Sequence, residues 1–189
     1  MFRLRLSTGL LSLLSVVAFI ACASDYGKSS NTEATGQGKS QSAVKIRVVA
    51  TVSPITSIAE NIGGTRIQLE GVIPEGMNSH TFEPQPSLAR LMAEADLIVI
   101  NGLFLEQPTL RLAEVNKRED AVILALGDHA ISSEDWQYDF SFPKSAGYPN
   151  PHLWPDPNLG LRYAELIHDQ LVVIDTDNAG YYGQNLSKF

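Results

Sequence analysis

Two histidines stand in short segments rich in proline, where the backbone has few conformations available. His80 lies in "PEGMNSHTFEPQPS", residues 74–87, and His152 lies in "NPHLWPDP", residues 150–157. Imidazole nitrogen can bind zinc, manganese, iron, nickel or copper, and zinc usually takes four ligands in a tetrahedral site. Because a tight metal site needs ligands that are already held in place, the two histidines are candidates for half of such a site.

Carboxylates near the two histidines have two possible roles. Glu75, Glu83 and Asp156 could supply oxygen ligands, or they could accept hydrogen bonds that fix an imidazole tautomer. Alternatively, Glu83 and Asp156 could cap the helices that we expect after them. The sequence leaves both roles open.

The other two histidines have weaker contexts. His168 lies inside an expected helix, close to Glu165 and Asp169, and we expect it to serve the surface or helix packing. His129 follows an expected strand and could reach the same edge of the fold as His80, but its neighbours provide no rigid support. We therefore favour His80 and His152 as ligands.

Strand-like and helical patterns alternate along the chain after its first 43 residues. The strands are expected at 44–52, 66–73, 96–103 and 121–128, and the helices at 53–62, 87–93, 108–115 and 158–174. This alternation predicts an α/β fold with a mostly parallel, four-stranded sheet flanked by helices. Ligands of such sheets bind at the carboxyl ends of the strands. His80 follows the second expected strand and would lie at that edge.

The amino-terminal segment has the features of an exported protein. Arg3 and Arg5 precede an apolar run, so residues 1–21 are predicted to be a signal peptide. Cys22 is the only cysteine, and "FIAC" resembles the lipobox of bacterial lipoproteins, in which this cysteine is lipidated. The rest of 22–43 is rich in small polar residues and predicts a flexible tether. We expect an extracytoplasmic lipoprotein that is anchored to a membrane through Cys22.

Several segments together resemble a known family, the solute-binding lipoproteins of bacterial zinc and manganese ABC importers, also called the cluster A-I family. The resemblance covers nearly the whole stretch after the tether. The segments that carry it are "VVATVSPITSIAENIGG", "VIPEGMNSHTFEPQPS", "ADLIVINGLFLE", "LGDHA" and "PHLWPDPN". The "HTFEP" and "PHLWPDP" motifs are its specific part.

The resemblance implies a metal-binding function and a set of residues for it. By position, His80 and His152 would be the two ligands of the amino-terminal lobe, with Glu83, Trp154 and Asp156 in supporting positions. The cargo would be one divalent metal ion, zinc or manganese. The protein would act as a monomer and deliver the ion to an ABC permease in the membrane.

The resemblance also implies a domain organisation. Family members have two α/β lobes of the periplasmic-binding-protein kind, joined by one long helix, with the metal between the lobes. Residues 44–176 would form the amino-terminal lobe and 177–189 the start of the linking helix. The second lobe, which supplies two further ligands in relatives, is absent from this sequence, so we expect a truncated chain.

Two positions and one region depart from the family pattern. Asn150 stands where relatives commonly have aspartate, and Pro155 replaces an aliphatic residue. Zinc-specific members often carry a long loop rich in histidine and acidic residues in the region of residues 130–148, whereas this chain is acidic there and has no histidine. This difference favours manganese slightly.

The sequence agrees less well with other functional classes than with metal transport. A net charge of -7 without a basic run disfavours a nucleic-acid binder. A zinc hydrolase could use His80 as a ligand and Glu83 as a general base, but the chain has no helical HExxH motif. A surface lipoprotein or adhesin with a structural metal remains an alternative to an importer component.

Overall fold

The computed structural model describes residues 45–189. The predicted signal peptide (1–21), Cys22 and the predicted tether (22–43) lie outside the described residues.

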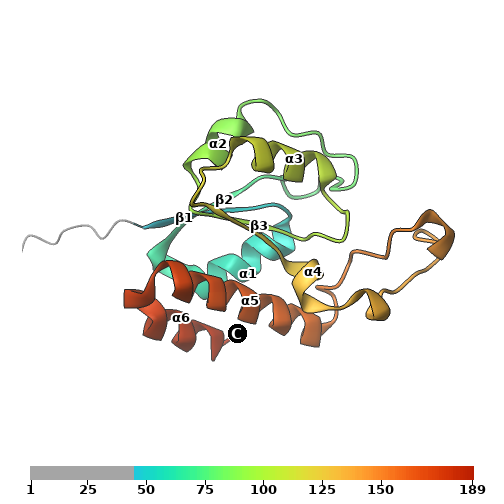
Figure 1. The fold of residues 1–189 in the computed structure, drawn as a ribbon. Coiled ribbons are helices and arrows are strands. Elements are labelled where there is room, and N and C mark those ends of the chain that lie inside the picture. The colour runs from blue at the N-terminus through green and yellow to red at the C-terminus, as the bar shows by residue number, and fades with distance from the viewer. Residues whose placement is uncertain (1–44) are drawn as a thin grey trace, which may run out of the picture. The chain divides into compact units, whose positions relative to one another are not determined.

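A four-stranded parallel sheet forms the centre of the fold, with the strand order β2-β1-β3-β4 (Figure 1). All three pairs of neighbouring strands are parallel. The strands are β1 (Ile46–Ala50), β2 (Ile67–Gly71), β3 (Leu97–Ile100) and β4 (Val122–Ala125). The predicted α/β class and the mostly parallel sheet are confirmed.

Helices cover both faces of the sheet. In Figure 1, α2 and α3 lie on one face, and α1, α5 and α6 lie on the other. The helices are α1 (Ser53–Gly63), α2 (Leu88–Glu94), α3 (Gln107–Asn116), α4 (Leu126–Ala130), α5 (Pro157–Ile174) and α6 (Ala179–Leu186). Within residues 45–189, none of the helices is both long enough and apolar enough to cross a bilayer.

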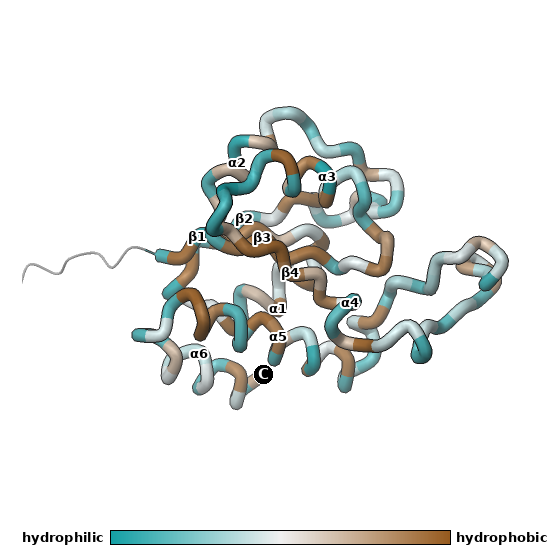
Figure 2. Tube along the Cα trace, viewed as in Figure 1, coloured by the Kyte–Doolittle hydropathy of each residue, from teal (hydrophilic) through white to brown (hydrophobic). Residues whose placement is uncertain are grey.

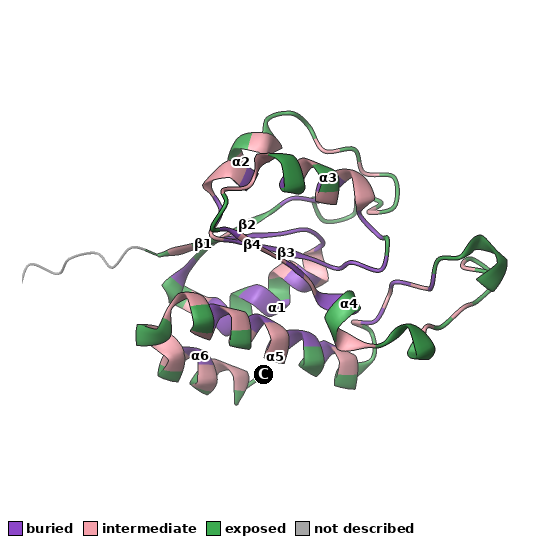
Figure 3. Ribbon diagram, in the orientation of Figure 1, coloured by how far each residue is buried: buried purple, intermediate pink, exposed green. Residues whose placement is uncertain are grey.

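The strands are apolar because the sheet is buried on both faces. All four residues of β3 are buried, and β1 ends in three buried residues, Val48, Val49 and Ala50. Figures 2 and 3 show the apolar, buried strands at the centre of the molecule. Helix α1 is amphipathic and buries one apolar stripe, formed by Ile55, Ile58, Ala59 and Ile62.

The fourth strand is shorter than predicted. The sequence pattern predicted a strand over 121–128, but β4 ends at Ala125 and α4 begins at Leu126. The chain turns here because the Gly127 amide donates a hydrogen bond to the Asn101 carbonyl, 2.7 Å away, beyond the end of β3. A side chain at Gly127 would meet Leu103 and that same carbonyl, so the close approach needs glycine.

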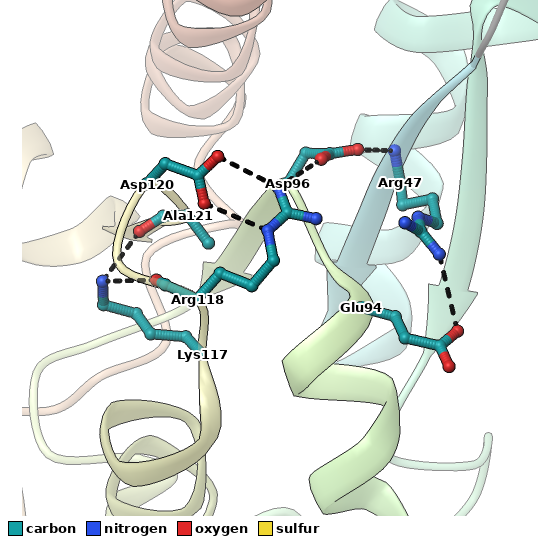
Figure 4. A network of polar contacts seen from close by, with 7 residues as sticks. All are labelled: Arg47, Glu94, Asp96, Lys117, Arg118, Asp120 and Ala121. Carbon is teal, nitrogen blue, oxygen red and sulfur yellow. Dashed lines mark hydrogen bonds and ion pairs between the residues drawn. The ribbon is translucent and has the colours of Figure 1, made fainter.

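The edge of the sheet at the amino ends of the strands is closed by a polar network (Figure 4). The Asp96 carboxylate accepts hydrogen bonds from the Arg47 backbone amide and the Arg118 guanidinium, both at 2.7 Å. Arg118 also pairs with Asp120, and Arg47 pairs with Glu94. These contacts tie β1, β3 and the turn before β4 together, and they leave the opposite edge of the sheet for the candidate site.

Candidate metal centre

The two candidate ligands come from loops at the carboxyl ends of the strands. His80 lies in the loop between β2 and α2, and His152 lies just before α5. The first loop leaves the sheet beside β1, because the Val72 and Ile73 amides donate to the carbonyls of Ala50 and Thr51. The predicted position of His80 at this edge is confirmed, and His152 is brought to it from a distant part of the chain.

The two imidazoles face each other through the same ring nitrogen. Nε2 of His80 and Nε2 of His152 are 3.2 Å apart, and the ring centroids are 5.2 Å apart. Two nitrogen ligands of a tetrahedral zinc, each about 2.0–2.1 Å from the ion, are separated by about 3.3 Å. The spacing therefore matches two neighbouring ligands of a single metal ion. Without a metal, one proton between the nitrogens satisfies the same pair.

The tautomer of His152 is set by Asn150. Nδ1 of His152 lies 2.7 Å from Oδ1 of Asn150, and the Asn150 amide group donates to Oδ2 of Asp139, also at 2.7 Å. Because a carboxylate only accepts, the Asn150 oxygen is turned toward the imidazole, which must donate its Nδ1 proton. The lone pair of His152 is then on Nε2, the atom that faces His80.

Aromatic rings lie beside the pair. The ring of Phe142 lies 5.6 Å from both imidazole centroids, and Trp154 packs against His152 in a T-shaped contact at 5.2 Å. Partial burial lowers the pKa of His80 below its ordinary range. The pKa of His152 is lowered by burial and by the neighbouring His80, while Asp139 opposes the shift. Both rings are thus neutral near pH 7, as metal ligation requires.

Behind the histidines, a buried polar network supports the loop of His152. The Asn101 amide donates to the Pro151 carbonyl at 3.0 Å, and the Tyr163 hydroxyl donates to the Asn101 oxygen at 2.9 Å. Glu106, only 2% exposed, accepts from the Thr51 hydroxyl and from the backbone amide of Asn101. Desolvation raises the pKa of Glu106. This network was not predicted, because its only signal in the sequence is a polar "NG" directly after an apolar strand.

A family model described as zinc-uptake complex component A, periplasmic, matches residues 48–189 of the chain. The chain belongs to this family. The manganese ABC transporter substrate-binding lipoprotein PsaA of Streptococcus anginosus is 31% identical over 98% of the chain and 56% of its own length. PsaA of Streptococcus pneumoniae is 33% identical, again over 98% of the chain and 56% of the relative. The chain spans just over half the length of these relatives.

Solved structures of similar proteins agree with the fold. The cadmium-bound periplasmic metal-binding protein of Candidatus Liberibacter asiaticus superposes with a TM-score of 0.67 and 26% identity, over 76% of this chain and 51% of that one. The periplasmic zinc-binding protein TroA of Treponema pallidum gives 0.68 at 21% identity, over 77% and 50%. The latter likeness shows the fold alone. Each neighbour is covered over about half its length, as one lobe of a two-lobed relative would be.

The structure also shows where the remaining predicted site residues lie. Trp154 contacts His152, as a supporting residue would. Asp156 accepts a hydrogen bond from the Asn158 amide at 2.8 Å and caps α5, which is the alternative role considered for it. Glu75 and Glu83 are exposed, and within residues 45–189 neither carboxylate makes a hydrogen bond or ion pair. A supporting role for Glu83 therefore stays a prediction.

The other two histidines do not join the site. His168 pairs with Asp169 and lies against α6, near Gly183. His129 is exposed on α4. Among the described residues, no group of three or more histidine, cysteine, aspartate or glutamate side chains converges on one point. This part of the chain thus presents two nitrogen donors, held at the spacing of metal ligands.

Proposed function

We propose that the protein is the extracytoplasmic substrate-binding component of an ABC importer and captures a divalent transition metal, zinc or manganese, through His80 and His152. The observation that carries the proposal is the 3.2 Å separation of the two Nε2 atoms, which face each other from loops far apart in the sequence. The tautomer fixed by Asn150 and the neutral state of both rings favour the same role.

The family supports the transport part of the proposal. Its description is that of an uptake component, and the relatives are named as substrate-binding lipoproteins of manganese and metal ABC transporters. The family is thus one of binding proteins and not of enzymes. A hydrolase would also need a general base beside the metal, but within residues 45–189 the exposed Glu83 makes no hydrogen bond or ion pair with either histidine. We therefore infer that the metal is cargo, passed to a membrane permease.

The choice between zinc and manganese rests on the ligands. Zinc binds more tightly than manganese at almost any site of nitrogen and oxygen donors, so selectivity for manganese must come from geometry, ligand type and availability. Two imidazoles alone favour zinc in solution, whereas the manganese names of the relatives favour manganese in the cell. We propose that the site accepts both ions and that the relative availability of zinc and manganese decides which ion it carries.

The test of the ligand assignment is metal retention by single-histidine variants. Purified chain is loaded with zinc or manganese, desalted and examined by elemental analysis. We expect His80→Ala and His152→Ala to lose most of the bound metal, with affinity reduced by more than the roughly 10- to 100-fold typical of losing a hydrogen-bond partner of a ligand. His129→Ala and His168→Ala are the matched controls and should retain it. Unchanged stoichiometry in His80→Ala would remove this residue from the site.

We also propose that Cys22 carries the lipid anchor. Acyl chains bind a bilayer in proportion to their buried methylene groups, and two or more chains are needed for stable anchoring. The wild-type protein should partition into the detergent phase of a two-phase extraction, and Cys22→Ser should move to the aqueous phase. Equal partitioning of the two proteins would contradict lipidation.

A deletion strain separates an importer component from an adhesin. Growth of that strain only when metal is supplied would favour an importer over an adhesin.

A further inference from the structure

Residues 136–150 form a long connection that leaves the body of the fold after α4 and returns to it before α5 (Figure 1). We call it the site loop. Most of its residues are exposed (Figure 3), and it contains one short 3-10 helix, Lys144–Ala146. A connection of this length with little regular structure is usually either a functional loop or a linker segment. The function proposed above gives a role only to its last residue, Asn150.

The first part of the site loop is organised by Asp139. One carboxylate oxygen accepts hydrogen bonds from the backbone amides of Ser141 (2.7 Å) and Phe142 (3.0 Å), and the other accepts from the Asn150 side chain. The Asn150 backbone amide also donates to the Gln137 carbonyl at 2.8 Å, which closes the loop on itself. Asp139 is therefore the single residue that joins the turn of the loop to the residue that holds His152.

Phe142 extends this arrangement to both imidazoles. The Phe142 backbone amide donates a hydrogen bond to Asp139. The centroid of the Phe142 ring lies 5.6 Å from the ring centroid of His80 and 5.6 Å from that of His152. His152 meets it in a T-shaped contact, and His80 meets it at a smaller tilt of 35°. Phe142 is therefore the one aromatic side chain of the loop whose ring lies beside both imidazoles. The preceding aromatic residue of the loop, Phe140, is fully exposed by contrast.

The two ends of the site loop are held by one residue from another element. Phe104, between β3 and α3, packs against Tyr148 at 4.8 Å and against Trp136 at 6.1 Å. Beneath the loop lies a cavity of about 520 Å³, lined among others by His80, Arg111 and Phe142. Because this cavity lies between much of the loop and α3, the contacts at the loop's ends and at its turn decide where it lies.

Phe104 is held in place by a strained turn. Three successive residues have positive backbone φ angles: +79° at Gly102, +48° at Leu103 and +65° at Phe104. Residues other than glycine rarely adopt such angles. Carboxylates stabilise the turn, since the Gly102 amide donates to Glu106 at 3.2 Å and the Leu103 amide donates to Asp128 at 3.1 Å. Such strain persists only where the surroundings enforce it, and it often marks a functional position. Here the turn holds Phe104, 44% exposed, against the loop.

From these contacts we propose that the site loop is part of the metal centre: Asp139 and Phe142 are positioning residues for His152 and His80, and Phe104 braces the loop that carries them. This inference rests on the proposed function, because it assigns further residues to the same site. It differs from a ligand assignment, since none of the three residues would touch the metal. Their effect is to keep both Nε2 atoms aimed at one point before the ion arrives.

The test compares variants of the loop with controls from the same segment of chain. Phe142→Ala and Asp139→Ala remove the two positioning groups, and Phe140→Ala and Glu134→Ala are their controls. Phe104→Asn removes the brace but keeps a residue that tolerates the left-handed backbone. Zinc affinity is measured by competition with a coloured chelator. The imidazole tautomer of metal-free His152 is measured from its ¹⁵N chemical shifts, and folding is checked by thermal melting.

We expect Phe142→Ala and Asp139→Ala to weaken zinc binding by about 10-fold, at the lower end of the effect of residues that orient a ligand. Phe104→Asn should weaken it less, and the two controls should match wild type. In metal-free Asp139→Ala, His152 should become a mixture of both tautomers, a change that a merely structural role would not cause. Phe142→Tyr should restore wild-type affinity.

Wild-type zinc affinity together with an unchanged His152 tautomer in Asp139→Ala and Phe142→Ala would overturn the inference. The two proposals fail in different ways. If the wild-type chain binds no zinc, the proposed function fails, but the tautomer measurement on metal-free protein still decides whether the loop orients His152. If His80→Ala abolishes binding while every loop variant is silent, the metal site stands and the role of the loop is wrong.

Discussion

Asn150 and His152 illustrate how one neutral hydrogen bond decides what an imidazole can do. With its Nδ1 proton 2.7 Å from the Asn150 oxygen, His152 keeps a free lone pair on Nε2. A carboxylate in place of Asn150 would accept the same hydrogen bond and would also make the ring a stronger donor to a metal. The neutral amide therefore keeps the geometry and gives up part of the electrostatic support.

Replacing Asn150 separates these two effects. Asn150→Leu removes the acceptor and should lower zinc affinity by about 10- to 100-fold. Asn150→Asp restores an acceptor with a negative charge and should bind zinc at least as tightly as wild type. Competition with a coloured chelator measures both affinities, and Asn61→Ala, on the exposed face of α1, is the control. Wild-type affinity in Asn150→Leu would show that the hydrogen bond does not orient the ligand.

The lowered pKa values of His80 and His152 predict a dependence of stability on pH. In the unfolded chain both rings take up protons near pH 6.5, whereas in the folded chain they resist protonation until a lower pH. Acidification below about pH 6.5 therefore stabilises the unfolded state, and the free energy of unfolding falls until the folded-state pKa is passed. Metal affinity should fall in the same window, because protons compete for the nitrogens.

Urea unfolding at pH 7.5 and pH 5.5, without metal, measures this effect. The wild-type chain should lose more stability between the two pH values than a His80→Gln, His152→Gln double variant, in which neither group titrates. His129→Gln, which alters an exposed histidine, is the matched control and should behave as wild type. Equal losses in wild type and the double variant would mean that the two rings titrate normally.

Among the elements, those with a clear period or a buried apolar run were predictable from sequence. The four strands follow from short, nearly continuous apolar runs, and the helices follow from apolar residues at helical spacing. The boundary between β4 and α4 was not predictable, since "AVILAL" is apolar throughout and α4 begins where the Gly127 amide meets the Asn101 carbonyl, beyond the end of β3. That contact joins residues from two different strand ends, and no local pattern encodes it.

The candidate site shows the same division. His80 and His152 were identified from the prolines and turns around them, and the structure brings the two together. The sequence did not reveal that Asp139, Phe142 and Asn101 surround them. Residues 136–150 have no periodicity, and Asn101 acts through a carbonyl 50 positions away. Their roles depend on tertiary placement, which a single sequence does not supply.

Asp156 gives a test of an element-scale role. Its side chain accepts from the Asn158 amide at the start of α5, so Asp156→Ala should lower the free energy of unfolding by about 1 kcal/mol. Asp156→Asn should retain most of that stability, because asparagine is an equally good cap. Urea unfolding measures both changes. If Asp156→Ala also weakens zinc binding, the residue supports the metal site as well as the helix; unchanged affinity would leave it as a helix cap only.

On the scale of the whole molecule, the two ends of the strands have different roles: the amino ends are structural, and the carboxyl ends carry the candidate site. Ion pairs around Asp96 and Arg118 close the edge at the amino ends of the strands. The opposite edge collects the loops of His80 and His152 and the network around Asn101. Binding of a metal at this edge would bring together segments separated by 72 positions, so it should stabilise the entire described fold and not one loop.

This coupling predicts that metal raises the melting temperature of the chain. A ligand at 100 times its dissociation constant stabilises the folded state by about 2.7 kcal/mol, which for a domain of this size corresponds to a shift of roughly 5–11 °C. Thermal melting followed by circular dichroism, with and without zinc, measures the shift, and excess chelator should reverse it. The His80→Ala, His152→Ala double variant should show no shift. An equal shift in that variant would place the stabilising metal elsewhere, because the variant lacks both imidazoles that would hold an ion between the loop after β2 and the segment before α5.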